Sequence, residues 1–186
     1  MKKLFFVLFS LTINVDTFAA FESTYEPLQS EKILFINGNI LDGEGNELLD
    51  TDLLIADGKI IAIGKGISVD DKDVKIIDAK NKWITPGIID IHSHMGVYPA
   101  PSVRTSSDGN EATSPVTAEV WAEHSMWVQD PQYALALKGG ITTFHVLPGS
   151  ANLIGGRGVT VKNLQRNTIQ SMKYPDAKHS LKMACG

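Results

Sequence analysis

Short apolar runs separated by glycine-containing turns fill the first half of the sequence. The dipeptides Asn37-Gly38 and Asp57-Gly58 interrupt these runs, and both favour tight hairpins because their residues tolerate positive φ. The pattern predicts short strands at 32–37, 39–42, 51–56, 59–63 and 74–78. Such strands, with a turn about every 10 residues, are typical of an antiparallel sandwich or barrel fragment. Residues 31–86 are therefore predicted to form a small N-terminal β-sandwich part that carries no chemistry.

The pattern changes after Pro86-Gly87. Residues 88–91 form a compact apolar run with one acid, which suits a strand buried on both faces, as in a parallel sheet. Asp130 and Pro131 have the residue types of a helix start, and Gly139-Gly140 ends that helix. The remaining pattern predicts helices at 116–128 and 131–138, strands at 141–147 and 159–162, and short helices at 168–172 and 180–184. A strand, helices and a second strand in this order predict that residues 87–186 begin a βα-repeat fold.

The N-terminus has the pattern of a secretory signal peptide over residues 1–19. Lys2 and Lys3 precede an apolar run at 4–13, and Thr17-Phe18-Ala19 supplies small residues before a cut after Ala19. A membrane anchor is the alternative, but the run is only about half of the roughly 20 residues that a spanning helix needs. The pattern predicts a secreted or periplasmic protein that is free of the membrane after cleavage, with residues 20–30 as a polar linker.

Composition narrows the function classes. The chain has 186 residues, of which 43% are hydrophobic, which is enough for one ordinary globular domain. A net charge of −4 and no Lys/Arg stripe argue against nucleic acid as a partner. The one cysteine, Cys185, excludes an internal disulfide and a Cys-x-x-Cys metal motif. Any metal must therefore be held by histidines and carboxylates.

The candidate metal ligands are His92 and His94, which follow the apolar run at 88–91. Alternate side chains of an extended segment point to one side, so both imidazoles could bind one divalent ion. Asp90 has the same parity and could orient a ligand histidine as a second-shell acceptor. A bare His-x-His also occurs by chance on exposed loops, and Asp90 could equally be a solvated or capping acid.

The stretch from Trp83 to His94 resembles the signature of the amidohydrolase superfamily, which is a Pro-Gly turn, an apolar strand and Asp-x-His-x-His. Asn37-Gly38 and residues 57–64 resemble the β-sandwich of that superfamily. Residues 140–143 and 147–156 resemble its second barrel strand and the loop after it. The resemblance covers about residues 33–162. It is closest to the secreted, imidazolonepropionase-like or dihydroorotase-like branch.

The resemblance implies an α/β fold, with an incomplete (β/α)8 TIM-type barrel after the β-sandwich. It also implies a divalent metal, zinc above all, as one or two ions held by His92 and His94. The activated water would hydrolyse the amide or cyclic amide C–N bond of a small-molecule substrate. The family's bridging lysine or glutamate, two further histidines and general-base aspartate match no residue here, so the catalytic and substrate-binding residues stay unassigned. A whole barrel needs about 250 residues, so residues 87–186 are expected to be an inactive N-terminal fragment of one.

Other residues leave alternatives open. His145 is predicted to be a hydrogen-bonded core histidine rather than a group that points into the barrel. Lys162 could be a carboxylated bridging lysine, and Arg157 could bind an anionic group or lie plainly on the surface. The alternative function is a secreted, non-catalytic metal-binding or structural module of the same fold. The sequence predicts no oligomeric state.

Overall fold

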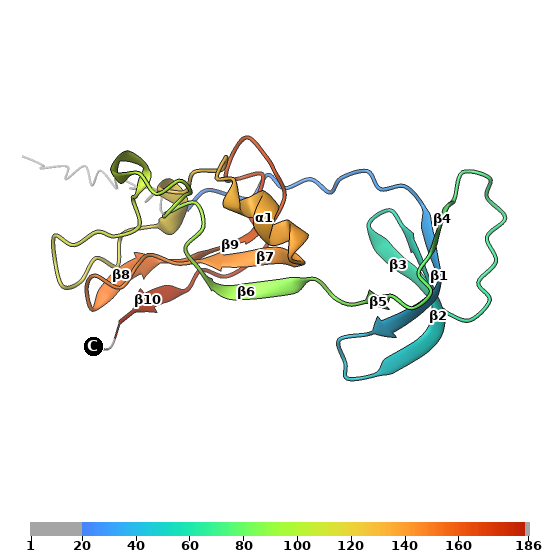
Figure 1. Ribbon diagram of the computed structural model, residues 1–186. Coiled ribbons are helices and arrows are strands. Elements are labelled where there is room, and N and C mark those ends of the chain that lie inside the picture. Colours follow the sequence, from blue (N-terminus) through green and yellow to red (C-terminus); the bar gives the residue numbers. More distant parts are fainter. Residues whose placement is uncertain (1–19, 185–186) are drawn as a thin grey trace, which may run out of the picture.

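The computed structural model describes residues 20–184 and has a mixed α/β fold built from two sheet-containing parts (Figure 1). The first part is a five-stranded sheet of β1 (Ile33–Leu41), β2 (Glu47–Ala56), β3 (Lys59–Gly64), β4 (Lys75–Asp78) and β5 (Trp83–Ile84). The second part contains β6 (Ile88–Ser93), α1 (Gln132–Lys138), β7 (Ile141–Val146), β8 (Ile154–Arg157), β9 (Val159–Lys162), β10 (Leu181–Met183) and two 3-10 turns, Arg104–Ser106 and Ala122–His124. The expected signal peptide of residues 1–19 lies outside the described residues.

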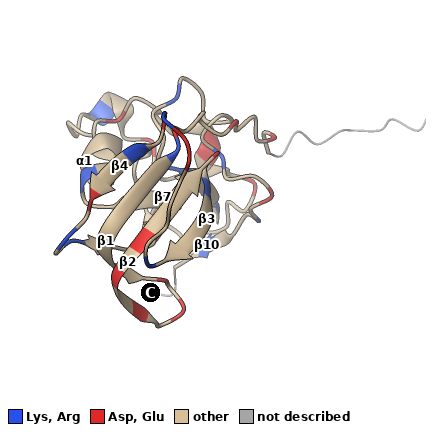
Figure 2. Cartoon of the chain, turned by 90° about the vertical axis from the view of Figure 1, so that its right-hand side faces the viewer, with Lys and Arg blue, Asp and Glu red and all other residues tan. Residues whose placement is uncertain are grey.

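The first sheet is mixed rather than purely antiparallel. Its order is β3-β2-β1-β4, and both β4 and β5 run parallel to β1. The Asp57-Gly58 hairpin is confirmed, with φ values of 52° and 69°. Asn37-Gly38, by contrast, does not end a strand: Asn37 has φ of 59° at a register shift inside β1, and its N–H donates to Asp52. The described residues of this part form one sheet, in which charges of both signs are interspersed (Figure 2).

The second part begins with the predicted parallel pair. β6 pairs with β7 in parallel, α1 precedes β7, and β9 returns antiparallel to β7. Asp130 accepts the N–H of Gln132 at 2.9 Å, so the expected cap at the start of α1 is present. The glycines at 139 and 140 follow the helix, as predicted. None of the described helices is long and apolar enough to cross a membrane.

The predicted helix at 116–128 is wrong. The segment consists of turns, irregular chain and two isolated bridges, and its only helical piece is the 3-10 turn at Ala122–His124. Thr117 donates its N–H to Ile154 at 2.8 Å, and Arg157 donates its N–H to Val120 at 2.7 Å. These bonds to β8, distant in sequence, replace the local bonds of a helix, because the chain satisfies its backbone groups wherever partners are available. The apolar residues of this segment pack against the core of the second part without forming a helix, as Ala122 and Met126 do.

Two further predictions near the C-terminus are corrected in the same way. Residues 168–172 form turns, and residues 181–183 form β10, which pairs antiparallel with β8. The pattern at 180–184 alternates in burial, with Lys182 inward and its two neighbours exposed. A period of two residues is typical of a strand, and a five-residue segment is too short to show a helical period.

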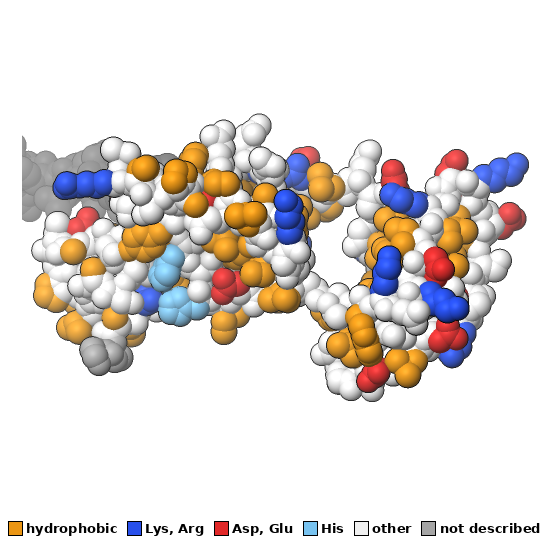
Figure 3. Space-filling view, viewed as in Figure 1, with side chains coloured by type: hydrophobic (Ala, Val, Ile, Leu, Met, Phe, Trp, Pro, Cys, Tyr) orange, Lys and Arg blue, Asp and Glu red, His pale blue; other side chains and the backbone are white. Residues whose placement is uncertain are grey.

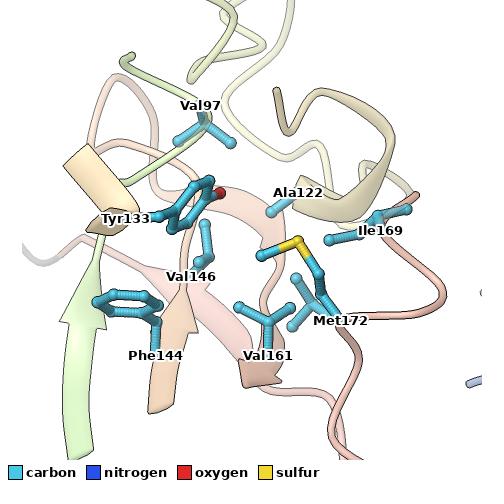
Figure 4. Packing of buried hydrophobic residues seen from close by; sticks show 9 residues of the cluster. Val97, Ala122, Tyr133, Phe144, Val146, Val161, Ile169 and Met172 are labelled. Atoms are coloured by element: carbon cyan, nitrogen blue, oxygen red, sulfur yellow. The ribbon is translucent and has the colours of Figure 1, made fainter. Parts of the chain in front are cut away.

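The core of the second part lies between the β6-β7-β9 sheet and the segments above it. Phe144, Val146 and Val161 are fully buried on the sheet, and Met172 and Tyr133 pack against them (Figure 4). β6 itself is not buried on both faces as the sequence suggests: Ile88 is 54% exposed and Ile91 is 76% exposed. β6 pairs only with β7 among the described strands, so it forms an open edge of the sheet.

The predicted polar linker is instead anchored to the second part. Phe21 donates its N–H to Glu123 at 2.9 Å and accepts a hydrogen bond from the ammonium of Lys173. Glu123 and Lys173 form a buried ion pair at 2.6 Å. Thr24 also donates its N–H to Gln170 at 3.0 Å. The segment of residues 20–32 runs between the two parts, and its first residues are hydrogen-bonded to the second part (Figure 1).

Replacing Tyr133 by phenylalanine is expected to raise the free energy of unfolding by about 1 kcal/mol. The Tyr133 hydroxyl is buried without a hydrogen-bond partner among the described residues, and burial raises the pKa of the phenol. The hydroxyl also lies against Gly96, where φ is 80° and a Cβ would collide with it. Urea unfolding of the wild type and the variant measures the change, and a less stable variant contradicts this account.

Candidate functional site

The two predicted ligand histidines lie together at the end of β6. Their ring centroids are 5.3 Å apart, with the ring planes at 80°. His92 is exposed, His94 is half-buried, and Ser93 between them is buried on the opposite side. Histidine side chains gather at this end of β6 on the surface shown in Figure 3, beside hydrophobic and acidic side chains. The strand parity therefore places both imidazoles on one side of the chain, as the sequence predicts.

The hydrogen bond of His94 fixes which nitrogen is free. Its Nδ1 lies 2.8 Å from the carbonyl oxygen of Leu147. A carbonyl oxygen only accepts, so Nδ1 carries the proton and the lone pair of the neutral ring is on Nε2. Histidines that bind metals are commonly held in this way, with the second ring nitrogen donating to a backbone carbonyl. His94 is thus held in the tautomer that a metal ligand needs.

Lys182 is the residue at this site that the sequence analysis missed. It comes from β10, its side chain is directed inward at 8% exposure, and its Nζ lies 3.3 Å from Nε2 of His92. Lys162 lies elsewhere, because its ammonium packs over the rings of Tyr25 and Tyr174 at 4.8 and 4.5 Å. No local signal in the sequence points to Lys182, because the apolar Leu181 and Met183 are exposed and the lysine between them is buried.

Asp90 contacts the main chain of the ligand segment. Its Oδ1 accepts the N–H of His92 at 3.0 Å, and its side chain is half-buried. This bond holds the backbone at the end of β6 rather than an imidazole nitrogen. The second-shell role toward a ligand ring stays a prediction.

The loop after His94 is held by the buried carboxylate of Asp130, which is 3% exposed. Its two oxygens accept the N–H of Gly96 at 3.0 Å and the N–H of Ala100 at 3.2 Å. They also accept the backbone and side-chain N–H groups of Gln132 at 2.9 Å. A single carboxylate thus ties the chain beyond His94 to the start of α1. The sequence predicted the cap but not this second task.

The other candidate residues are engaged in packing. Arg157 donates from Nε to the carbonyl of Ala118 at 3.1 Å and stacks over Trp121 at 4.9 Å. His179 is half-buried and lies edge-on to Trp121 at 4.7 Å. His124 is exposed, and its ring lies 5.0 Å from that of Phe21. None of these residues joins the His92 and His94 pair.

His145 is half-buried, and both of its ring nitrogens are hydrogen-bonded, as predicted. Its Nδ1 lies 2.9 Å from the hydroxyl of Thr160, and its Nε2 lies 2.6 Å from the hydroxyl of Ser180. Burial lowers the pKa of His145, and the neighbouring His179 lowers it further. At neutral pH the ring is therefore uncharged.

The lowered pKa of His145 predicts that stability falls in mild acid. The unfolded chain binds a proton near pH 6.5 and the folded chain only at lower pH, so this contribution is complete above about 6.5 and is lost as the pH falls through the folded pKa. Unfolding free energies between pH 5 and 7 measure the effect. We expect His145→Gln to flatten the dependence and the exposed His124→Gln to leave it unchanged. An equal slope in all three proteins contradicts the assignment.

The nitrogen donors at the end of β6 have the chemistry of metal ligands. Nε2 of His94 is free, and Nε2 of His92 lies 3.3 Å from the buried amine of Lys182. Nitrogen donors of this kind suit zinc and related divalent ions. Within residues 20–184, no group of three His, Cys, Asp or Glu side chains is placed to hold a metal. The residues present therefore fit a metal site whose ligand set they do not complete.

Comparisons with known proteins show which proteins the chain resembles. An amidohydrolase of Hapsidospora irregularis is 32% identical over 146 residues, which cover 73% of this chain and 15% of that protein. A dihydroorotase of Bacillus cytotoxicus is 34% identical over 117 residues, which cover 63% of this chain and 21% of that protein. A solved structure of an amidohydrolase from Thermotoga maritima has a TM-score of 0.71 and 38% identity, and covers 83% of this chain and 39% of that one. No family model matches the chain.

The chain belongs to the amidohydrolase superfamily, as the signature at 83–94 indicated. It spans 15–21% of the length of these two curated relatives and 39% of the solved structure.

Proposed function

We propose that the protein to which this sequence belongs is a metal-dependent hydrolase of amide or cyclic amide C–N bonds in a small molecule. The observation that carries the proposal is the state of His94, whose Nδ1 is bonded to the Leu147 carbonyl so that Nε2 is free beside His92. The similarity to an amidohydrolase and a dihydroorotase supports the same reaction class. An incomplete (β/α)8 barrel after the N-terminal sheet is the fold that we propose for the catalytic part.

His92 and His94 would hold the metal, with zinc as the first candidate, through their Nε2 atoms. A bound divalent ion lowers the pKa of its water toward about 7 and polarises the carbonyl under attack. Lys182 would be the bridging group. As an ammonium it has no lone pair for a metal. Its neutral amine can add to CO2, losing one proton, to give a carbamate whose two oxygens are ligands.

The environment of Lys182 supports this role. The side chain is almost wholly buried, and its Nζ lies 3.3 Å from Nε2 of His92. Asp90 keeps the His92 main chain in place, and Asp130 keeps the following loop in place. We further propose that the protein is secreted or periplasmic, on the strength of the N-terminal pattern at 1–19.

Metal content and hydrolysis test the proposal in two steps. The 186-residue chain, freed of metal and titrated with zinc, is expected to bind zinc, and His92→Ala is expected to abolish this binding while His124→Ala keeps it. Hydrolysis of dihydroorotate and hydantoin is then measured on a natural polypeptide that extends the sequence past Gly186. Zinc binding without any hydrolysis would favour the non-catalytic module, and unchanged zinc binding in His92→Ala would remove the ligand assignment.

A further inference from the structure

The placement of Lys182 depends on the register of a very short strand. β10 has three residues, and its outer two, Leu181 and Met183, are 45% and 57% exposed, whereas Lys182 is 8% exposed. Successive side chains of a strand point to opposite faces, so a shift by one residue would turn Lys182 outward and an apolar residue inward. The contact that fixes the register of β10 therefore determines whether the Lys182 amine lies beside His92.

The partner strand does little to fix it. β10 pairs only with β8 among the described strands, and Lys182 lies opposite Gly156. β8 contains Gly155 and Gly156, which offer no side chains to interlock with β10. The pairing also has a register shift between Lys182 and Met183. Register is weakly specified in glycine-rich strands of this kind, so another contact must supply the constraint.

Ser180 provides that contact. It lies two residues before Lys182 and so has the same parity along the extended chain. Its hydroxyl lies 2.6 Å from Nε2 of His145, and its carbonyl accepts the N–H of Gly158 at 3.0 Å. The space is closed around it, because a Cβ on Gly158 would approach the Ser180 hydroxyl to 2.7 Å and Nε2 of His145 to 3.0 Å.

His145 is itself held from the other side. Its Nδ1 bonds the hydroxyl of Thr160, the residue directly opposite it in the β7-β9 pair. β7 and β9 lie in the core of the second part, and their residues Phe144 and Val161 are fully buried. His145 therefore connects a rigid sheet with the beginning of a loosely specified strand.

We propose that His145 is a positioning residue: its hydrogen bond to Ser180 fixes the register of β10 and thereby places Lys182 beside His92. The consequence for a metal rests on the proposed function, but the placement itself does not. The alternative is that His145 is a structural residue whose hydrogen bonds do not affect β10. In that case, removing the Ser180 hydroxyl would leave the position of Lys182 unchanged.

Amine labelling of the full chain tests the placement without any metal. The metal-free protein, in buffer without bicarbonate, is treated with acetic anhydride, and acetylation of each lysine is followed by mass spectrometry. Ser180→Ala is expected to raise the labelling rate of Lys182 about five-fold, the factor that corresponds to a hydrogen bond of about 1 kcal/mol. Ser180→Thr, which keeps a hydroxyl, is expected to restore protection, and His145→Gln is expected to resemble Ser180→Ala.

Internal and matched controls separate this result from general unfolding. Lys173, buried in its ion pair with Glu123, reports whether the fold is intact, and the exposed Lys178 reports the activity of the reagent. Ser171→Ala removes a serine hydroxyl from a distant turn and is expected to leave Lys182 protected. Unchanged Lys182 labelling in both Ser180→Ala and His145→Gln, or a parallel rise at Lys173, overturns the proposal. If Lys182 labelling rises in these variants but the wild-type protein binds no zinc, the positioning role stands and only the proposed metal function is removed.

Discussion

Replacing Lys173 by methionine is expected to lower the free energy of unfolding by about 3–5 kcal/mol. The change leaves the buried carboxylate of Glu123 without its partner at 2.6 Å and removes the donor to the Phe21 carbonyl. A buried charge that has lost its partner keeps its desolvation cost and loses the attraction that offset it. Chemical denaturation of the full chain measures the loss, and protease cleavage within residues 20–32 should accelerate with it.

Two controls test the cause of that loss. In the double variant Glu123→Leu with Lys173→Met, no unpaired charge remains, so most of the stability is expected to return. Lys32→Met breaks an ion pair with Asp71 at 2.5 Å whose side chains are about a third exposed, and we expect a much smaller effect there because solvent screens such a pair. Equal losses for Lys32→Met and Lys173→Met would show that burial is not the deciding factor.

Replacing His94 by alanine is expected to weaken zinc binding by on the order of 100-fold or more, since even partners behind a ligand are worth about 10–100-fold. The change removes the imidazole whose Nε2 is free and whose Nδ1 is anchored to Leu147. Zinc affinity is measured by competition with a chromophoric chelator. His124→Ala is the matched control, because His124 is an exposed histidine away from the pair and should leave the affinity unchanged.

Much of the fold follows from local signals in the sequence. The positive φ values at Asp57 and Gly58 follow from residue chemistry, and the start of α1 follows from the capping ability of Asp130. The parity of His92 and His94 likewise fixes their side of the strand, and their ring separation of 5.3 Å agrees with it. These features depend on residues within a few positions of one another.

The features that sequence reasoning missed depend on distant partners. Residues 116–128 have helical spacing, yet Thr117 bonds Ile154 across 37 positions and the segment forms no α-helix. Lys182 reaches His92 across 90 positions, and nothing near Lys182 in the sequence indicates that contact. Long-range pairing overrides local propensity in both places.

The open edge at β6 has the same explanation. An apolar run predicts burial, but burial needs a covering element, and the exposed Ile88 and Ile91 have none among the described residues. The apolar residues 88–91 indicate a strand that is suited to burial, but they do not indicate which element covers it.

X-ray diffraction from zinc-soaked crystals, measured on both sides of the zinc absorption edge, tests the metal site most directly. The account predicts one anomalous peak within about 2.0–2.1 Å of Nε2 of both His92 and His94, with Nδ1 of His94 still bonded to the Leu147 carbonyl. Imidazoles turned away from each other, or zinc bound at His124 or His179 with this pair left empty, would contradict it.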